Sequence, residues 1–329
     1  MTRLVVSSFN VEWMNDWFER DDSNEGIRFK DTFKERGSGT MVRTEIVATR
    51  VSKTIKKINP DILSIQEGPS RKEEMDLFIN TYLDGQYSCD FGSDGRAQKI
   101  FFLYKKDKFD QVNKIETDYN PLGFDVNGDF IIDEVKFTRS PLEMNFSIGN
   151  KSFRLFGIHL KSPYINDGER LWNDPETRNE YIKESLVNRR RLLTEAIAVR
   201  ERMDSILQEQ PNVVILGDLN DGPGKEYFEK LLLGLDITEK LLGDVYSPKD
   251  IFSLPFSLES DFTAIFDDFV ENIENKKLLL DRILISPKLL EALIESKVEY
   301  EAYNENTEDS NRREGRPSDH RPVTVTIDL

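Results

Sequence analysis

The stretch Val213-Val214-Ile215-Leu216-Gly217-Asp218-Leu219-Asn220 decides the fold class. Its run of branched apolar residues predicts a short buried strand, and Asp218 and Asn220 stand where that strand ends. Asp and Asn are also ordinary turn residues, so one such ending indicates little about function. What matters is whether other strands of the chain end in the same way.

Segments of the same kind recur along the chain. They are short, rich in Val, Ile, Leu and Phe, and bounded by turn or charged residues: 3–9, 61–66, 99–104, 153–159, 212–217, 278–285 and 322–328. Helical patterns lie between them, at about residues 44–57, 182–207, 225–233 and 287–296. This alternation predicts an α/β fold. The Asn127-Gly128 pair predicts a hairpin, so we expect mixed sheets.

The composition is that of a globular protein, with 38% hydrophobic and 32% charged residues among 329. The chain has no linker rich in Pro, Gly or Ser and no repeat of fixed period, so we expect residues 1–329 to form one domain. No apolar run approaches the ~18 residues of a membrane span. Cys89 is the single cysteine, which predicts a reducing, cytoplasmic location. The segment 1–10 fits a first strand better than a secretory signal.

Polar side chains that suit metal binding or proton transfer follow several of the predicted strands. Asn10 and Glu12 follow the first strand, Glu67 the second, and His159 closes the strand at 153–159. Ligand sites in α/β folds gather beyond the carboxyl ends of strands, so we expect these residues to converge with Asp218. The chain has only two histidines, and His320 also borders an apolar run.

These residues fall into motifs that occur in a fixed order. The motifs are Phe9-Asn10-Val11-Glu12, Pro60-Asp61-Ile62 through Gln66-Glu67, Gly217-Asp218-Leu219-Asn220, Leu280-Asp281-Arg282-Ile283 and Ser318-Asp319-His320-Arg321-Pro322-Val323. Together with His159 they resemble the endonuclease/exonuclease/phosphatase superfamily, which has the fold of pancreatic deoxyribonuclease. The match covers nearly the whole chain. The His-Leu-Lys-Ser form at 159–162 is similar to the branch seen in bacterial nucleases.

The resemblance implies a four-layer α/β sandwich, in which two mixed sheets pack face to face with helices outside. It also implies a phosphoester hydrolase site that uses Mg²⁺, with Mn²⁺ as a substitute. Mg²⁺ prefers oxygen ligands and keeps exchangeable waters. By this resemblance Glu67 is the first metal ligand, Asn10 and Asp319 assist, and Glu12 acts directly or through water.

The catalytic roles are likewise implied by the resemblance. Asp218 would orient or activate the attacking water, and Asn220 would hold a phosphate oxygen. Asp281 would pair with His320 and stabilise its imidazolium. The sequence leaves open which of His320 and Asp218 removes the proton from water.

His159 separates branches of the superfamily, because the deoxyribonuclease and sphingomyelinase branches carry His here and the abasic-site endonucleases carry Tyr. A protonated His159 is a candidate acid for the leaving group. Where deoxyribonuclease supports this ring with a Glu, the nearest match here is Gln98, which brings no full charge.

Arg139 and Lys161 are candidate contacts for the substrate phosphate, and the alternative for Lys161 is a solvated loop cation. Basic residues at 311–316 add positive charge near His320 and could bind phosphates as well.

A metal-dependent phosphodiesterase, foremost a nuclease acting on DNA more than RNA, is the reading that we favour. The net charge of −16 disfavours a broad basic groove for nucleic acid. It mildly favours the alternative function, a phosphatase or phosphodiesterase that acts on a small or lipid phosphate. A non-catalytic binding protein on the same fold is the third.

Overall fold

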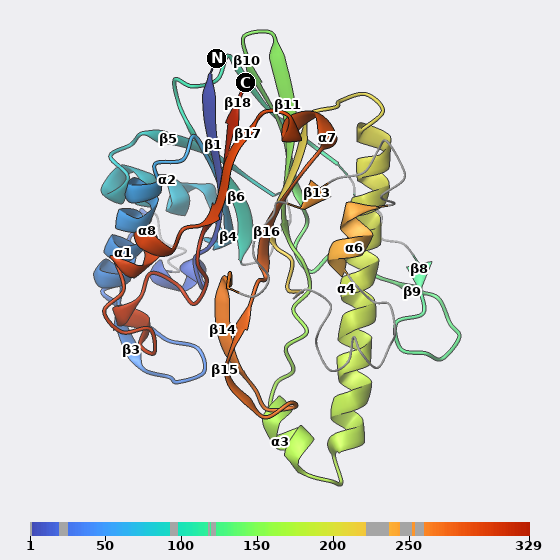
Figure 1. Ribbon diagram of the computed structural model, residues 1–329. Helices are drawn as coiled ribbons and strands as arrows, with labels where there is room; N and C mark the ends of the chain where they lie inside the picture. Colours follow the sequence, from blue (N-terminus) through green and yellow to red (C-terminus); the bar gives the residue numbers. More distant parts are fainter. Residues whose placement is uncertain are drawn as a thin grey trace.

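The structure is a computed structural model, and it describes residues 2–19, 26–92, 98–117, 119, 123–221, 237–243, 252–253 and 260–329. Two six-stranded mixed sheets form its centre and lie face to face (Figure 1). The first sheet has the strand order β17-β18-β1-β4-β6-β5, and the second has the order β13-β16-β12-β11-β10-β7.

The strands of the first sheet are β1 (Arg3–Asn10), β4 (Ile62–Gly68), β5 (Tyr87–Phe91), β6 (Lys99–Lys105), β17 (Leu293–Val298) and β18 (Val323–Asp328). Those of the second are β7 (Gln111–Ile115), β10 (Leu142–Ile148), β11 (Lys151–His159), β12 (Val213–Asp218), β13 (Phe252–Ser253) and β16 (Asp281–Ile285). Three small hairpins pair β2 (Thr32–Lys34) with β3 (Met41–Arg43), β8 (Gly123–Phe124) with β9 (Asp133–Glu134), and β14 (Ala264–Asp268) with β15 (Ile273–Leu278).

The helices of the described residues are α1 (Thr44–Ile58), α2 (Lys72–Tyr82), α3 (Gly168–Asn173), α4 (Arg178–Ile206), α6 (Ile237–Leu242), α7 (Pro287–Leu290) and α8 (Tyr300–Asn304), with short 3-10 turns η1 (Met14–Trp17) and η2 (Arg313–Gly315). Figure 1 shows α1 and α2 outside the first sheet and α4 outside the second. None of the helices in these ranges is long and apolar enough to cross a membrane.

Each sheet holds one parallel pair of strands, β1 with β4 and β11 with β12. Parallel neighbours need a crossover connection, and here α1 connects the first pair while α3 and α4 lie between the strands of the second. Of these helices, α1 covers the outer face of the first sheet and α4 covers that of the second (Figure 1). Parallel pairing puts the carboxyl ends of the two strands of each pair at the same end of their sheet.

Hydrophobic residues fill the three interfaces between the four layers. In β12 the side chains alternate: Val214 and Leu216 pack between the two sheets, while Val213 and Ile215 pack against α4. Phe9 and Ile65 face the α1–α2 layer together with Val51 and Phe78. The expected four-layer α/β sandwich with two mixed sheets is thus confirmed.

The expected strands all occur, and most of their ends agree within about two residues. The segment 278–285 is an exception. It divides into β15 and β16, because the chain leaves the β14–β15 hairpin at Leu279 and joins the main sheet at Asp281. Backbone N–H groups of Leu280 and Asp281 both donate to Thr263 Oγ1 at this corner, at 3.0 Å.

The prediction of a helix at 287–296 is wrong beyond Leu290, where α7 ends. The chain instead enters β17, which pairs with β18 at the edge of the first sheet, from Leu293 opposite Ile327 to Val298 opposite Val323. The partner strand supplies hydrogen bonds that outweigh the helical preference of the segment. The hairpin expected around Asn127-Gly128 is confirmed by the β8–β9 pair. The helix expected at 225–233 lies outside the described residues.

Candidate active site

Strand register brings the predicted site residues to one edge of the sandwich. Parallel pairing of β1 and β4 puts Asn10 beside Gln66, the residue before Glu67. In the second sheet, His159 lies opposite Asp218, and Asp218 lies opposite Asp281. Side chains from both sheets therefore meet where β1, β4, β11 and β12 end.

Asn10 connects the two sheets at this edge. Its Nδ2 donates to Asp218 Oδ2 at 3.0 Å and lies 3.4 Å from Glu67 Oε1. Its Oδ1 accepts the backbone N–H of Glu12 at 3.1 Å. The amide of Asn10 is therefore fixed between two carboxylates that come from different sheets.

A β-bulge directs Glu67 toward the site. The register between β4 and β6 shifts between Ile65 and Gly68, and Glu67 has a left-handed backbone with φ 58°. Bulges turn a side chain out of the regular alternation of a strand, often beside functional sites. The backbone N–H of Trp13 donates to Glu67 Oε2 at 2.8 Å and fixes the orientation of the carboxyl group.

Glu67 and Asp319 are two interacting carboxyl groups that could hold a cation. Burial, and then the nearby charge of Asp319, raise the pKa of Glu67 to about 7. A divalent ion beside Glu67 would offset both effects, because it neutralises the carboxylate charge that burial and Asp319 disfavour. Oxygen atoms of Glu67, Asp319 and Asn10 are also the donor type that Mg²⁺ prefers, so the residues fit such an ion.

Glu12 stands beside this group, but its carboxylate oxygens are already engaged. Oε1 accepts from Arg316 at 3.0 Å, and Oε2 accepts the backbone N–H of Asp319 at 2.9 Å and lies 3.2 Å from Arg313 Nε. Because two arginines already neutralise the charge of Glu12, this arrangement favours a supporting role in which it orients Asp319, over direct binding of a metal.

His320 and Asp281 form a buried pair. Nδ1 of His320 lies 2.6 Å from Asp281 Oδ2, and Nε2 lies 4.0 Å from Asp218 Oδ2. Burial disfavours the charged ring, but Asp281 and then Asp218 outweigh it and raise the pKa of His320 well above its ordinary value. One ligand atom from each of Asp218, Asp281 and His320 lies within 4.8 Å of the others, so these atoms form a second group that could hold a metal.

His159 faces the same oxygen from the other side, with Nε2 at 3.5 Å from Asp218 Oδ2. Gln98 does not support this ring as the sequence suggested, because its Oε1 accepts from Arg139 at 3.0 Å. Nδ1 of His159 has no hydrogen-bond partner in the part of the chain that the structure describes. Burial, together with Arg139 and His320, lowers the pKa of His159 well below its ordinary value.

The side chains of Asn220 and Arg139 both contact the backbone carbonyl group of Leu160. The oxygen of Leu160 accepts Asn220 Nδ2 at 2.9 Å and lies 3.5 Å from Arg139 Nη1. The backbone N–H of Asn220 donates to Asp218 Oδ1 at 2.8 Å. Lys161 behaves differently. Its ammonium donates to the carbonyl of Ser162 and lines a separate polar hollow with Lys136, Arg191 and Glu195.

Comparison with protein families identifies the family of this chain. The family model described as Endonuclease/Exonuclease/phosphatase family matches residues 8–320. The chain belongs to this family. No curated protein is significantly similar to it in sequence.

Solved structures of low sequence identity share the fold. TDP2 from Caenorhabditis elegans has a TM-score of 0.55 at 17% identity, over 100% of this chain and 75% of that one. An endonuclease/exonuclease/phosphatase from Bacteroides vulgatus has a TM-score of 0.53 at 13% identity, over 100% of both chains. The 3'-5' exonuclease NExo from Neisseria meningitidis has a TM-score of 0.50 at 16% identity, over 99% of this chain and 100% of that one.

Two arginines of this family member serve a different purpose from the one expected. Arg313 and Arg316 lie in the basic segment 311–316, which we expected near substrate phosphates. Arg313 is 2% exposed and donates to the backbone carbonyls of Val11, Arg316 and Pro317. Arg316 pairs with Glu12. Both arginines hold the segments around Glu12 together and are already engaged within the protein.

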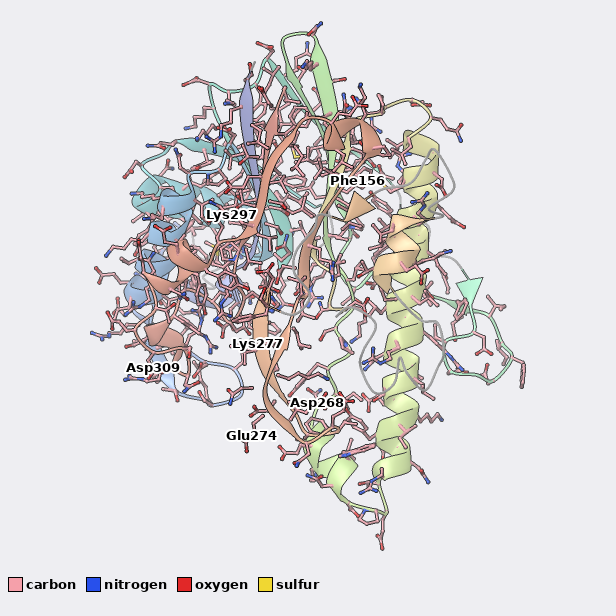
Figure 2. All side chains as sticks on the ribbon, in the orientation of Figure 1. Phe156, Asp268, Glu274, Lys277, Lys297 and Asp309 are labelled. Carbon is pink, nitrogen blue, oxygen red and sulfur yellow. The ribbon has the colours of Figure 1, made fainter. Side chains whose placement is uncertain are left out.

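Sequence reasoning missed two features beside the site. Glu195 of α4 is buried and accepts backbone N–H groups from two site loops. It lies on the buried stripe of α4 with Asn188, Leu192 and Val199, and an acid on such a stripe is a signal that the sequence offered. The second is Phe266 of β14, whose ring centroid lies 6.1 Å from that of His320. The projecting β14–β15 hairpin can be followed in Figure 2 by its labelled residues Asp268, Glu274 and Lys277.

Proposed function

We propose that this protein is a metal-dependent phosphodiester hydrolase, most of all a nuclease that cleaves DNA. The observation that carries the proposal is one continuous series of contacts from Glu67 through Asn10 and Asp218 to His320 and Asp281. It joins a cation site to a pair of proton-transfer groups across both sheets, as hydrolysis of a phosphoester requires.

Glu67, Asp319 and Asn10 would hold Mg²⁺, with Mn²⁺ as a substitute, and Glu12 would orient Asp319. When bound, such an ion neutralises charge on the phosphate and offers a template for in-line attack by water. Asp218 Oδ2 accepts a hydrogen bond from the amide of Asn10, and burial raises the pKa of the Asp218 carboxyl group. A carboxylate with a raised pKa is the better acceptor for the proton of the attacking water.

His320 acts as the imidazolium in this scheme. Asp281 on Nδ1 stabilises the charged ring, so Nε2 presents a proton toward the phosphate. A charged His320 cannot also accept a proton, which favours Asp218 as the base. His159 with its lowered pKa acts as a neutral hydrogen-bond donor through Nε2, in place of the protonated acid considered from the sequence. Asn220 and Arg139 would contact phosphate oxygens, and Lys161 would meet a phosphate farther along the substrate.

An aromatic hollow beside His320 supports a polynucleotide over a small phosphate. The hollow is lined by the loop after β11, by α4 and by the β14–β15 hairpin, and includes Ile165, Tyr181 and Phe269. At its edge Tyr164 is 72% exposed and Phe266 is 40% exposed. Exposed rings beside a phosphate site offer surfaces on which bases stack.

The test is a substrate panel with plasmid DNA, RNA, a generic diester and a generic monoester, each with Mg²⁺ and with a chelator. We expect turnover of the diesters, with DNA above RNA, and its loss with the chelator. Glu67→Ala, Asp218→Ala and His320→Ala should each lower kcat/KM by about 100-fold or more while circular dichroism shows a folded chain. Lys57→Ala is the control, because Lys57 is ion-paired with Glu301 and Glu305 at the end of α1.

The outcomes separate the three readings of the sequence. Turnover of the monoester alone would favour the phosphatase acting on a small or lipid phosphate, toward which the net charge of −16 leans. Binding of DNA without turnover of any substrate would favour the non-catalytic protein. Full activity in any one of the three site variants would remove the role assigned to that residue.

A further inference from the structure

A buried carboxylate on α4 receives hydrogen bonds from two loops that carry site residues. Oε1 of Glu195 accepts the backbone N–H of Thr138 at 2.7 Å, and Oε2 accepts the backbone N–H of Lys161 at 2.7 Å. Glu195 is only 2% exposed. Both donors are main-chain groups, so the carboxylate fixes the backbone of each loop and does not merely bind its side chains.

The two loops hold the phosphate-facing side of the site. Thr138 precedes Arg139, and Lys161 follows Leu160, whose carbonyl oxygen accepts Asn220 Nδ2 at 2.9 Å and lies 3.5 Å from Arg139 Nη1. The Leu160 N–H in turn donates to the backbone oxygen of Asp218 at 3.1 Å. A shift of either loop would therefore move Arg139 and Asn220 relative to Asp218.

We propose that Glu195 is a positioning residue, which clamps the 138–139 and 160–161 loops so that Arg139 and Asn220 face the scissile phosphate. This inference rests on the proposed function for its effect on turnover, but the clamp itself does not. Burying a carboxylate is costly unless its oxygens are hydrogen-bonded, and here each oxygen receives a short bond from a main-chain donor. Position 195 therefore requires a side chain with two hydrogen-bond acceptor atoms, and Gln has only one acceptor oxygen.

The first experiment measures the clamp without any substrate. In Glu195→Gln the new amide group faces a backbone N–H, so one of the two hydrogen bonds is lost. We expect amide hydrogen exchange at Thr138 or Lys161 to become about 10-fold faster, since protection reports local opening. Unchanged protection at both amides would overturn the clamp, whatever the activity of the protein.

The second experiment is a double-mutant cycle with Arg139. We expect Glu195→Gln to lower kcat on plasmid DNA about 10-fold, with a much smaller change in KM, because misplacing a positioned group costs rate. In an Arg139→Ala background the same change should cost less than about three-fold, since residues that act through one another are not additive. Equal losses in both backgrounds would show a general structural role and overturn the proposal.

Glu143→Gln is the matched control. Glu143 is also a buried carboxylate, 1% exposed, but it binds Arg154 and Arg202 on β11 and α4. It should lower stability while its effect on kcat combines additively with Arg139→Ala and the amides of Thr138 and Lys161 keep their protection. If Glu195→Gln does not fold, Glu195→Asp, which keeps the charge on a shorter arm, takes its place with the same expected signs.

The two hypotheses fail in different ways. A wild-type protein that turns over no phosphoester removes the proposed function, and the exchange experiment still decides whether the clamp exists. An active wild-type protein with unchanged exchange in the Glu195 variant retains the function and removes the clamp.

Discussion

The two histidines of this chain share one carboxylate oxygen but differ in what else surrounds them. Both Nε2 atoms approach Asp218 Oδ2, at 3.5 Å from His159 and 4.0 Å from His320. His320 also has Asp281 on Nδ1, whereas His159 has Arg139 in its electrostatic surroundings. Burial disfavours the charged form of each ring, so the second neighbour decides the sign of the pKa shift.

Titration by NMR of the protein treated with a chelator tests this difference directly, because the sequence has 2 histidines and hence two ring signals to assign. We expect His320 to titrate above its ordinary pKa and His159 below it. Asp281→Asn should lower the pKa of His320, since it removes the anion that stabilises the imidazolium. Arg139→Ala should raise the pKa of His159, since it removes a cation that destabilises the imidazolium.

Gln98→Ala is a suitable control for the second variant, because Gln98 touches Arg139 but carries no charge. Two histidines that both titrate near pH 6.5, as unperturbed rings do, would contradict the electrostatic assignment and the division of roles built on it.

At the scale of elements, the site depends on how closely β11 and β12 approach. Gly217 has a φ of 148°, and a Cβ atom on it would lie 1.8 Å from the backbone oxygen of Ile158. No relaxation of a flexible side chain can relieve a clash with main chain in a paired strand. The glycine therefore permits the register that puts His159 opposite Asp218.

We expect Gly217→Ala to lower the free energy of unfolding by about 3 kcal/mol or more, because it combines strain with a backbone displacement in the core. Gly149→Ala is the control. Gly149 has a φ of 59° but no atom near its Cβ position, so strain alone should cost about 1 kcal/mol. Urea denaturation measures both, and equal losses in the two variants would contradict the argument from close approach.

How far the sequence predicts these elements depends on where their stabilising contacts lie. The strand Val213–Asp218 was predictable because it begins with four branched apolar residues and is buried on both faces. The strand at 293–298 was not predictable, because it is stabilised by pairing with β18, and the local sequence carries no information about that partner. The break at Leu279 was hidden because Leu278, Leu279 and Leu280 form one apolar run across it, and only the change of partner strand separates β15 from β16.

The same reasoning applies to the predicted site. Strand-end residues such as Asn10 and Asp218 were predictable because parallel pairing forces their strand ends to one edge. The ion pairs of Glu12 with Arg313 and Arg316 were not predictable, because they join segments about 300 positions apart in the chain. Glu195 was overlooked because its neighbours Arg191 and Arg200 make that part of α4 resemble a solvated helix.

At the scale of the whole molecule, the net charge of −16 limits how the protein can hold a polyanion. Such a chain repels DNA at long range, so under the proposed function binding would have to come from a few local cations and a bound metal ion. The cations proposed to meet phosphates are Arg139 and Lys161. Arg313 and Arg316 are already engaged inside the protein.

Salt dependence measures this limit. Each phosphate neutralised by a side chain contributes about −0.9 to the slope of log binding against log salt, so two contacts give a slope of about −2. Screening of the long-range repulsion acts in the opposite direction and makes the slope shallower still. We expect kcat/KM on plasmid DNA, measured at fixed Mg²⁺, to fall with a slope no steeper than about −2.

Lys161→Ala should reduce the steepness by about one, whereas Lys57→Ala should leave it unchanged because Lys57 lies at the end of α1 and pairs with Glu301 and Glu305. A generic diester with a single phosphate should show almost no dependence, since it releases few counterions. A slope of about −5 or steeper on plasmid DNA would require a broad basic surface. The assignment of Arg139 and Lys161 as the phosphate contacts would then be wrong.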